Sequence, residues 1–267
     1  MCQLDPAILG FYGERYDEDQ RLVRSRHGRL EFVRTQQLLR RHLPPPPCVV
    51  LDIGGGTGIH ARWLAEDGYD VHLIDPVLRH VLHASSNAAF TSTLGDARNL
   101  PMDDDAVDIV LLLGPLYHLT DAGDRRQALA EAVRVTRPGG QVIVAAISRY
   151  AALLELAGFG EFDEEAATEV VQLIETGIHR DDSRSFTTAY FHRAEELAVE
   201  LSVAGLGDVR VLGIEGPSVP ALDNASEKSV VSVFESAVRC AQVVETDPAL
   251  MSASPHLLGL GRVLPAQ

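Results

Sequence analysis

Cysteine, positive charge and long apolar runs are all scarce in this sequence of 267 residues. Its three cysteines, Cys2, Cys48 and Cys240, lack the spacing of a zinc site or a disulfide framework, which fits a reducing compartment. Lys and Arg number 23 against 38 Asp and Glu, a formal charge of −15, so we expect no nucleic-acid partner. No apolar stretch reaches the ~20 residues that span a bilayer, and acidic residues come too early for a signal peptide. These absences predict a soluble, cytoplasmic protein with no membrane partner.

Apolar runs and helical patterns alternate through the middle of the chain. The prolines of "RRHLPPPPC" end a helical segment, and runs typical of strands follow at 48–53, 70–75 and 106–114. The run "AVDIVLLLG" is the most continuous, as expected of a central parallel strand that is covered on both faces. With a short strand near Asp96 and another after "RPGG", five strand–helix units fill residues 48–148. This rhythm predicts a doubly wound, Rossmann-like α/β fold.

Two segments depart from that rhythm. Residues 1–43 are predicted to form an N-terminal helical cap, and 44–267 one domain with a seven-stranded, mostly parallel sheet. Residues 149–192 are longer than an ordinary connection, so we expect a helical insert that acts as a lid over the acceptor site. The helix–strand pattern then returns, and "PHLLGLGRVL" supplies a last strand.

The segment "LDIGGGTGIHARWL", residues 51–64, places a glycine-rich turn between the first strand and a helix. A Walker A loop needs a lysine where this chain has His60. A dinucleotide fingerprint needs its third glycine one residue later than Gly58. Asp52, at the end of the strand, would repel a pyrophosphate. The turn therefore favours a cationic ligand.

The pattern D-x-G-G-G-T-G, with Asp75 closing the next strand, resembles the cofactor site of class I S-adenosylmethionine (SAM)-dependent methyltransferases over about residues 48–148. The resemblance implies that Asp52 supports the amino-acid end of SAM and that Asp75 accepts hydrogen bonds from both ribose hydroxyls. In "GDARNLP" it implies that Asp96 accepts from the adenine amino group and that the Ala97 amide meets a ring nitrogen. S-adenosylhomocysteine would be the product. The predicted cofactor set is Asp52, Gly54, Gly55, Gly56, Gly58, Asp75, Pro76, Asp96, Ala97 and Gly114, with Tyr16 and Arg21 from the cap near the methionyl end.

The segment "GPLYHL" stands where the family places the residues that flank the transferred methyl group. Enzymes that methylate nucleobase or glutamine amides often carry [ND]-P-P-[YF] there, and this chain lacks the first acceptor of that motif. Metal-dependent catechol enzymes place an aspartate there, and Gly114 is no ligand, so we expect no metal. The segment resembles a group of bacterial small-molecule methyltransferases.

Methyl transfer is an in-line displacement that needs positioning and the exclusion of water, and it needs a base only if the acceptor must lose a proton. Tyr117 and His118 are the candidates for both catalysis and acceptor binding. His179 and His192 are further candidate bases, because histidine titrates near neutral pH. Tyr190, among the aromatic residues of the insert, is a candidate for acceptor binding.

We therefore expect methyl transfer to an O or N atom of a small molecule, or of a short peptide end, in bacterial secondary metabolism, by a monomer or homodimer. A SAM-binding regulator or partner subunit without transferase activity would carry the same cofactor residues. An oxidoreductase would share the fold, but the glycine spacing and Asp52 oppose it.

Overall fold

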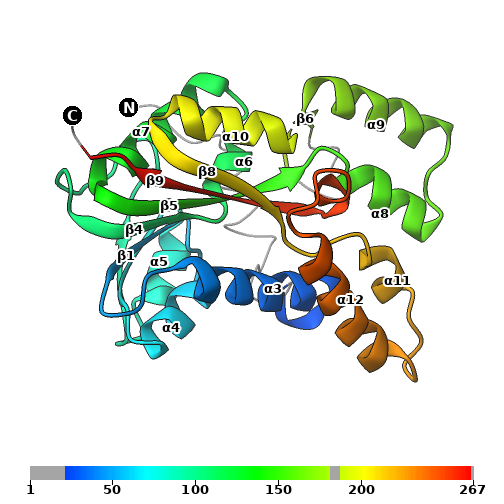
Figure 1. Ribbon diagram of the computed structural model, residues 1–267, viewed down its shortest axis with the longest axis horizontal. Helices are drawn as coiled ribbons and strands as arrows, with labels where there is room; N and C mark the ends of the chain where they lie inside the picture. Colours follow the sequence, from blue (N-terminus) through cyan, green and yellow to red (C-terminus); the bar gives the residue numbers. More distant parts are fainter. Residues whose placement is uncertain (1–21, 181–186, 266–267) are drawn as a thin grey trace.

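The computed structural model describes residues 22–180 and 187–265, and within them nine strands form one sheet with helices on both faces (Figure 1). Five strands run parallel in the order β3-β2-β1-β4-β5. They are β1 (Val49–Ile53), β2 (Asp70–Asp75), β3 (Thr91–Leu94), β4 (Val107–Leu112) and β5 (Thr136–Ser148). The predicted runs at 48–53, 70–75 and 106–114 match β1, β2 and β4 closely, and β4 lies at the centre as expected.

Two further strands, which run antiparallel to each other, complete the predicted seven-stranded sheet. β9 (His256–Val263) pairs with β5, and β8 (Leu206–Gly213) pairs with β9. Two shorter strands from the insert add to it: β7 (Ala189–His192) runs parallel to the end of β5, and β6 (Ile178–His179) pairs with β7. The Rossmann-like, mostly parallel α/β fold is thereby confirmed, and part of the insert is strand rather than helix.

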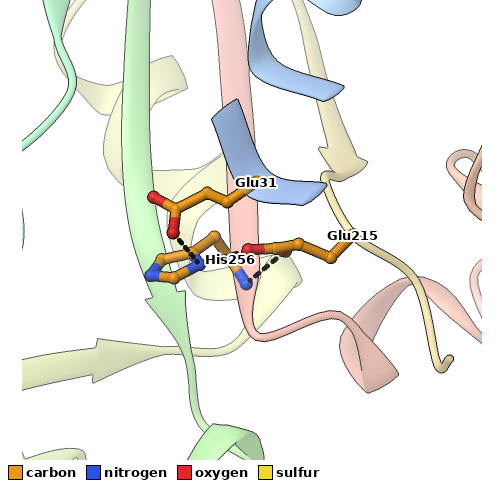
Figure 2. A group of neighbouring side chains, drawn as sticks. All are labelled: Glu31, Glu215 and His256. Atoms are coloured by element: carbon orange, nitrogen blue, oxygen red, sulfur yellow. Dashed lines mark hydrogen bonds and ion pairs between the residues drawn. The ribbon is translucent and has the colours of Figure 1, made fainter. Parts of the chain in front are cut away.

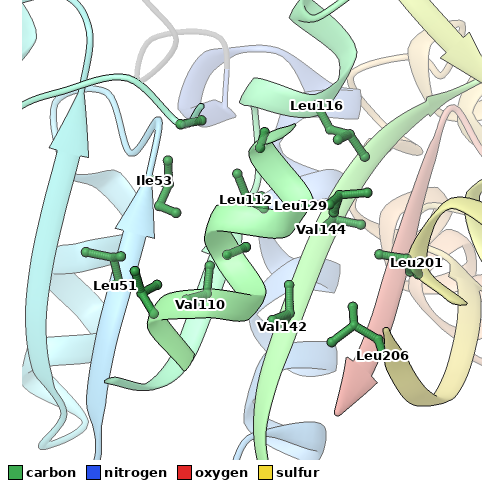
Figure 3. Close-up of a cluster of buried hydrophobic side chains, with 14 of the residues drawn as sticks. Leu51, Ile53, Val110, Leu112, Leu116, Leu129, Val142, Val144, Leu201 and Leu206 are labelled. Atoms are coloured by element: carbon green, nitrogen blue, oxygen red, sulfur yellow. The ribbon is translucent and has the colours of Figure 1, made fainter. Parts of the chain in front are cut away.

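Alternate residues of the central strands face opposite sides of the sheet. Leu51, Val110 and Val142 belong to one buried cluster, which α7 (Ala122–Val135) and α10 (Ala194–Val203) cover (Figure 3). Their neighbours, including Val50 and Ile109, belong to a second cluster. That face is covered by α3 (Arg26–His42), α4 (Ile59–Glu66) and α5 (Leu78–Ala84). Coverage on both faces explains the continuous apolar runs.

Helix α3 packs into the core. The side chain of Ser25 caps it by accepting from the Gly28 amide at 3.0 Å, and it ends at His42, just before the prolines. Its leucines enter two buried clusters, one of them shared with α11 (Val219–Asp223) and α12 (Val230–Val244). The boundary at residue 43 stays a prediction. Tyr16 and Arg21 lie outside the described residues.

The insert carries its own small core. Helices α8 (Ala151–Phe159) and α9 (Glu164–Thr176) follow β5, and Leu173 packs with Ile147 and Phe191. The buried guanidinium of Arg149 donates to the Phe191 carbonyl at 2.6 Å and forms an ion pair with Glu196. These contacts fix the insert to the end of β5. Among the described helices, which also include α6 (Pro115–His118) and the short η2 (Met251–Ala253), none is long and apolar enough to cross a membrane.

The buried guanidinium of Arg34 gives a test of how α3 is held. It donates to the Ile214 carbonyl at 3.1 Å and to Glu245 at 2.6 Å. Arg34→Ala would leave a buried carboxylate short of a partner, so we expect the free energy of unfolding in urea to fall by about 3 kcal/mol. Arg40→Ala on the same helix removes an exposed pair with Asp67 and should cost under about 1 kcal/mol. Equal losses for the two variants would contradict this account.

Candidate functional site

A pocket lies at the carboxyl ends of β1, β2 and β4, the edge where doubly wound folds bind ligands. It encloses about 1100 Å³ of empty space, counting its open mouth. Of the residues predicted to bind the cofactor, nine line it: Asp52, Gly54, Gly55, Gly56, Asp75, Pro76, Asp96, Ala97 and Gly114. The structure thus brings together residues from the ends of four successive strands.

Backbone forms one wall of the pocket, at the glycine turn. Gly54 has φ +70°, and a Cβ there would lie 2.5 Å from the Cγ of Pro115. Gly56 has φ +58°, and a Cβ there would meet no atom within 4 Å. The space beside Gly56 is therefore open to a ligand that can approach bare backbone.

The carboxylate of Asp75 holds this turn in place. One oxygen, Oδ2, accepts from the Gly56 amide at 2.9 Å. The other, Oδ1, accepts from the Val77 amide at 2.9 Å and lies 3.1 Å from Nδ1 of His80. Each carboxylate oxygen can accept more than one hydrogen bond, so contact with a ligand hydroxyl stays compatible with these bonds.

The carboxyl group of Asp52 is fully buried beneath the turn. Among the residues that the structure describes, its Oδ2 has no hydrogen-bond partner. Burial, and secondarily the nearby charge of Asp75, raise the pKa of Asp52 to about 7. A buried carboxylate without a partner is unfavourable, and a cationic group in the pocket would relieve that cost.

Asp96 is fixed by its neighbour Arg98. Both its oxygens accept from the Arg98 guanidinium, and Oδ1 also accepts from the Arg98 amide at 2.9 Å. Burial opposes ionisation, but these hydrogen bonds outweigh it and lower the pKa of Asp96. Asp96 is therefore an ionised acceptor at the wall of the pocket.

Tyr117 and His118 line the opposite side of the pocket, on the short helix α6. Tyr117 packs against the core of the insert, and its ring centroid lies 4.6 Å from that of His118. Burial lowers the pKa of His118 to about 3, so its imidazole is neutral at physiological pH. A neutral imidazole can accept a proton, but a pKa this low makes it a weak base, and the catalytic role of His118 stays a prediction.

The other predicted site residues do not line the pocket. A Cβ on Gly58 would lie 2.5 Å from the ring of Phe90, so that glycine permits packing. His179 stacks on Phe191, with 5.5 Å between ring centroids. The guanidinium of Arg125 lies over the ring of Tyr190, 3.8 Å from the centroid of that ring. These three residues lie outside the lining of this pocket, and their predicted roles stay predictions.

His192 is buried in the same region as Tyr190. Its Nε2 lies 3.3 Å from a carboxylate oxygen of Glu200. Burial lowers the pKa of His192 and outweighs the opposing effect of Glu200. His192 does not line this pocket, and its role as a base stays a prediction.

Sequence reasoning did not name several residues of the pocket wall, among them Leu22, Glu31, His60 and His80. His60 lies in the first turn of α4, just after the glycine turn, and His80 lies in the first turn of α5, just after Asp75. Their positions directly after these motifs could have identified them. Leu22 and Glu31 come from the N-terminal helical segment, far from every motif. No local pattern marks them.

Comparison with known proteins agrees with this site. A family model described as a methyltransferase domain matches residues 51–144. An uncharacterized methyltransferase of Mycobacterium tuberculosis is 38% identical over 102 residues, which cover 38% of this chain and 40% of the relative. A demethylmenaquinone methyltransferase of Corynebacterium urealyticum is 34% identical over 136 residues, covering 51% of this chain and 56% of the relative. The chain thus matches about half, or less, of the length of these curated relatives.

Solved structures extend the likeness to the whole fold. A SAM-dependent methyltransferase from Thermotoga maritima, described as a possible histamine N-methyltransferase, has a TM-score of 0.60 and 20% identity. The alignment covers 97% of this chain and 99% of that one. A phosphoethanolamine N-methyltransferase of Haemonchus contortus, bound to S-adenosylhomocysteine, has a TM-score of 0.53 and 16% identity, covering 88% and 53%. At these identities the likeness concerns the fold.

Residues 51–144 of this chain thus resemble a methyltransferase domain. Over that region the chain is similar to bacterial methyltransferases, one of which is named a demethylmenaquinone methyltransferase. SAM is the implied methyl donor, and two features of the pocket fit it. The open space beside Gly56 admits a sugar against backbone, and the buried carboxyl of Asp52 suits a ligand that carries positive charge.

The raised pKa of Asp52 predicts how stability depends on pH. Its pKa moves from 3.8 to about 7, so the ligand-free folded state holds a proton that the unfolded state loses between these values. Stability contributed by this group is therefore lost as pH rises from about 4 to 7. We expect the melting temperature of Asp52→Asn to exceed that of the native protein at pH 8, and the gap to close toward pH 4. A gap that stays the same between pH 4 and pH 8 would contradict the shift.

The position of Asp75 predicts a loss of cofactor affinity on substitution. Asp75→Ala removes the acceptor of the Gly56 amide and any acceptor for ribose hydroxyls, so SAM binding should weaken by roughly 1.5 to 3 kcal/mol. Isothermal titration calorimetry measures this directly. Asp70→Ala, at the exposed start of the same strand, should bind SAM as the native chain does. Equal affinities for Asp75→Ala and the native chain would remove Asp75 from the cofactor site.

Proposed function

We propose that this protein transfers the methyl group of SAM to an oxygen or nitrogen atom of a small molecule, in bacterial secondary metabolism. One observation carries the proposal: a single pocket joins the glycine turn and its carboxylates to Tyr117, His118 and Glu31. A protein that only bound SAM would need no room beyond the cofactor residues. The extension of the pocket toward α6 supports a second ligand beside the cofactor.

The residues of the pocket have different roles according to their position. Asp52, Asp75 and Asp96 offer acceptors to the cofactor, and the bare backbone at Gly56 lets it lie close. SAM supplies the methyl group on a sulfonium. The neutral imidazole of His118 does not repel that positive charge, and it can exchange a hydrogen bond with the acceptor. Apolar walls, such as Leu113 and Leu119, reduce the water around the reacting atoms.

The lining of the pocket favours a small acceptor with both polar and apolar parts. Tyr117 offers a ring and a hydroxyl, and Glu31 offers a carboxylate. A phenol, a quinol or an amine matches these groups. The name of the Corynebacterium relative, which points to a quinone precursor, is consistent with an acceptor of this size. An acceptor panel with radiolabelled SAM tests the proposal, and transfer to none of a broad set of phenols, quinols and amines would contradict it.

Removing polar groups on the acceptor side should lower turnover and leave cofactor binding almost unchanged. Tyr117→Phe and His118→Ala are expected to lower the rate with the best acceptor at least tenfold, while SAM affinity stays within a few-fold. Tyr150→Phe is the matched control, because its hydroxyl accepts from Arg193 at 2.6 Å in the insert. Unchanged turnover in both pocket variants would place the acceptor elsewhere.

A further inference from the structure

Three ionisable side chains from distant parts of the chain meet beside the pocket (Figure 2). Glu31 comes from α3, Glu215 follows β8, and His256 begins β9. One oxygen from each carboxylate and one nitrogen of the imidazole all lie within 4.8 Å of one another. The function proposed above uses Glu31 as a polar group on the acceptor side, but it assigns no role to Glu215 or His256.

Two carboxylates approach the same ring nitrogen. Nδ1 of His256 lies 2.5 Å from Oε1 of Glu215 and 3.7 Å from Oε2 of Glu31. A ring nitrogen carries at most one hydrogen, and 3.7 Å is too long for a hydrogen bond. A proton on Nδ1 can therefore form a hydrogen bond with Glu215 but not with Glu31. A divalent cation, in contrast, would be bound by all three atoms.

Binding a cation would change the distances between these atoms. Ligand atoms about 2.1 Å from a tetrahedral ion stand about 3.4 Å apart. The His256–Glu215 pair, now hydrogen-bonded at 2.5 Å, would open, and the His256–Glu31 pair, now at 3.7 Å, would close slightly. Because one ligand is nitrogen and two are oxygen, the set suits a transition-metal ion such as Zn²⁺ or Mn²⁺ better than Mg²⁺, which prefers oxygen alone.

The orientation of Glu215 is fixed in the way that metal ligands usually are. Its second oxygen, Oε2, accepts from the hydroxyl of Ser254 at 2.8 Å and from the amide of His256 at 3.0 Å. The Glu215 side chain is almost fully buried. One ligand is therefore rigid, and Glu31 lies at the wall of the pocket.

We propose that Glu31, Glu215 and His256 form a binding site for a divalent transition-metal ion at the acceptor side of the pocket. Through Glu31, the ion would stand within reach of a hydroxyl or carboxylate oxygen of the acceptor. This site is distinct from the position of Gly114, on which the expectation of no metal was based. It does not depend on the methyltransferase activity.

Titration of EDTA-treated protein with Co²⁺ tests the site by calorimetry and by visible absorption. We expect one equivalent to bind, with Mg²⁺ at least tenfold weaker, and Glu31→Gln and His256→Gln each to raise the dissociation constant at least tenfold. Glu235→Gln, on the exposed face of α12, is the control and should bind as the native chain does. No binding to the native protein, or binding that survives both substitutions, would overturn the proposal.

A second measurement covers variants that fail to fold. In the native protein, substoichiometric Mn²⁺ should broaden the imidazole NMR signals of His256 before those of the other nine of its ten histidines. Broadening that begins at another histidine would overturn the site. SAM affinity measured in EDTA tests the cofactor assignment separately, so failure of one proposal is distinguishable from failure of the other.

Discussion

The shape of the pocket depends on one carboxylate, that of Asp75, which binds the backbone of the glycine turn from the neighbouring strand. The parallel pairing of β1 with β2 places the ends of the two strands side by side, and the Gly56 amide comes within reach of Asp75. His80 and the Val77 amide fix the same carboxylate from the other side. The Gly54 amide, which donates to the Ile74 carbonyl at 2.6 Å, fixes the start of the same turn to β2.

The same arrangement makes the empty pocket electrostatically unfavourable. Asp52 is buried close to the charge of Asp75, and both effects oppose its ionisation. A ligand that brings positive charge removes this cost, so part of the binding free energy comes from strain in the ligand-free state. Affinity for a cationic ligand and reduced stability in its absence thus share one cause.

Much of the fold and of the cofactor half of the site could be predicted from the sequence, because both depend on local patterns. The run at 106–114 is almost entirely apolar, and this composition indicates a buried strand. Asp52, Asp75 and Asp96 each lie near the end of a successive strand, so their order along the chain could be predicted. Glu31 could not be found, because it reaches the pocket only through the packing of α3. The low pKa of His118 could not be predicted either, because it depends on how deeply α6 is buried.

The insert shows what composition cannot reveal. Its aromatic residues suggested an acceptor site, and that role stays a prediction. Tyr190 contacts Arg125, and Phe191 and Ile147 share a core. Composition could not distinguish a residue that lines a cavity from one that anchors a segment, because both need large side chains. Tyr117 does both, since it faces the pocket and packs against that core.

The two sides of the pocket also differ in when a growing chain can build them. Every residue that is predicted to bind the cofactor and that the structure describes lies between Asp52 and Gly114, so these residues can come together while translation continues. Glu31 is synthesised earlier still, but Glu215 and His256, with which it clusters, emerge only after the insert and β8. A nascent chain therefore presents Tyr117, His118 and Glu31 at the acceptor side before the cluster of Glu31 with Glu215 and His256 is complete.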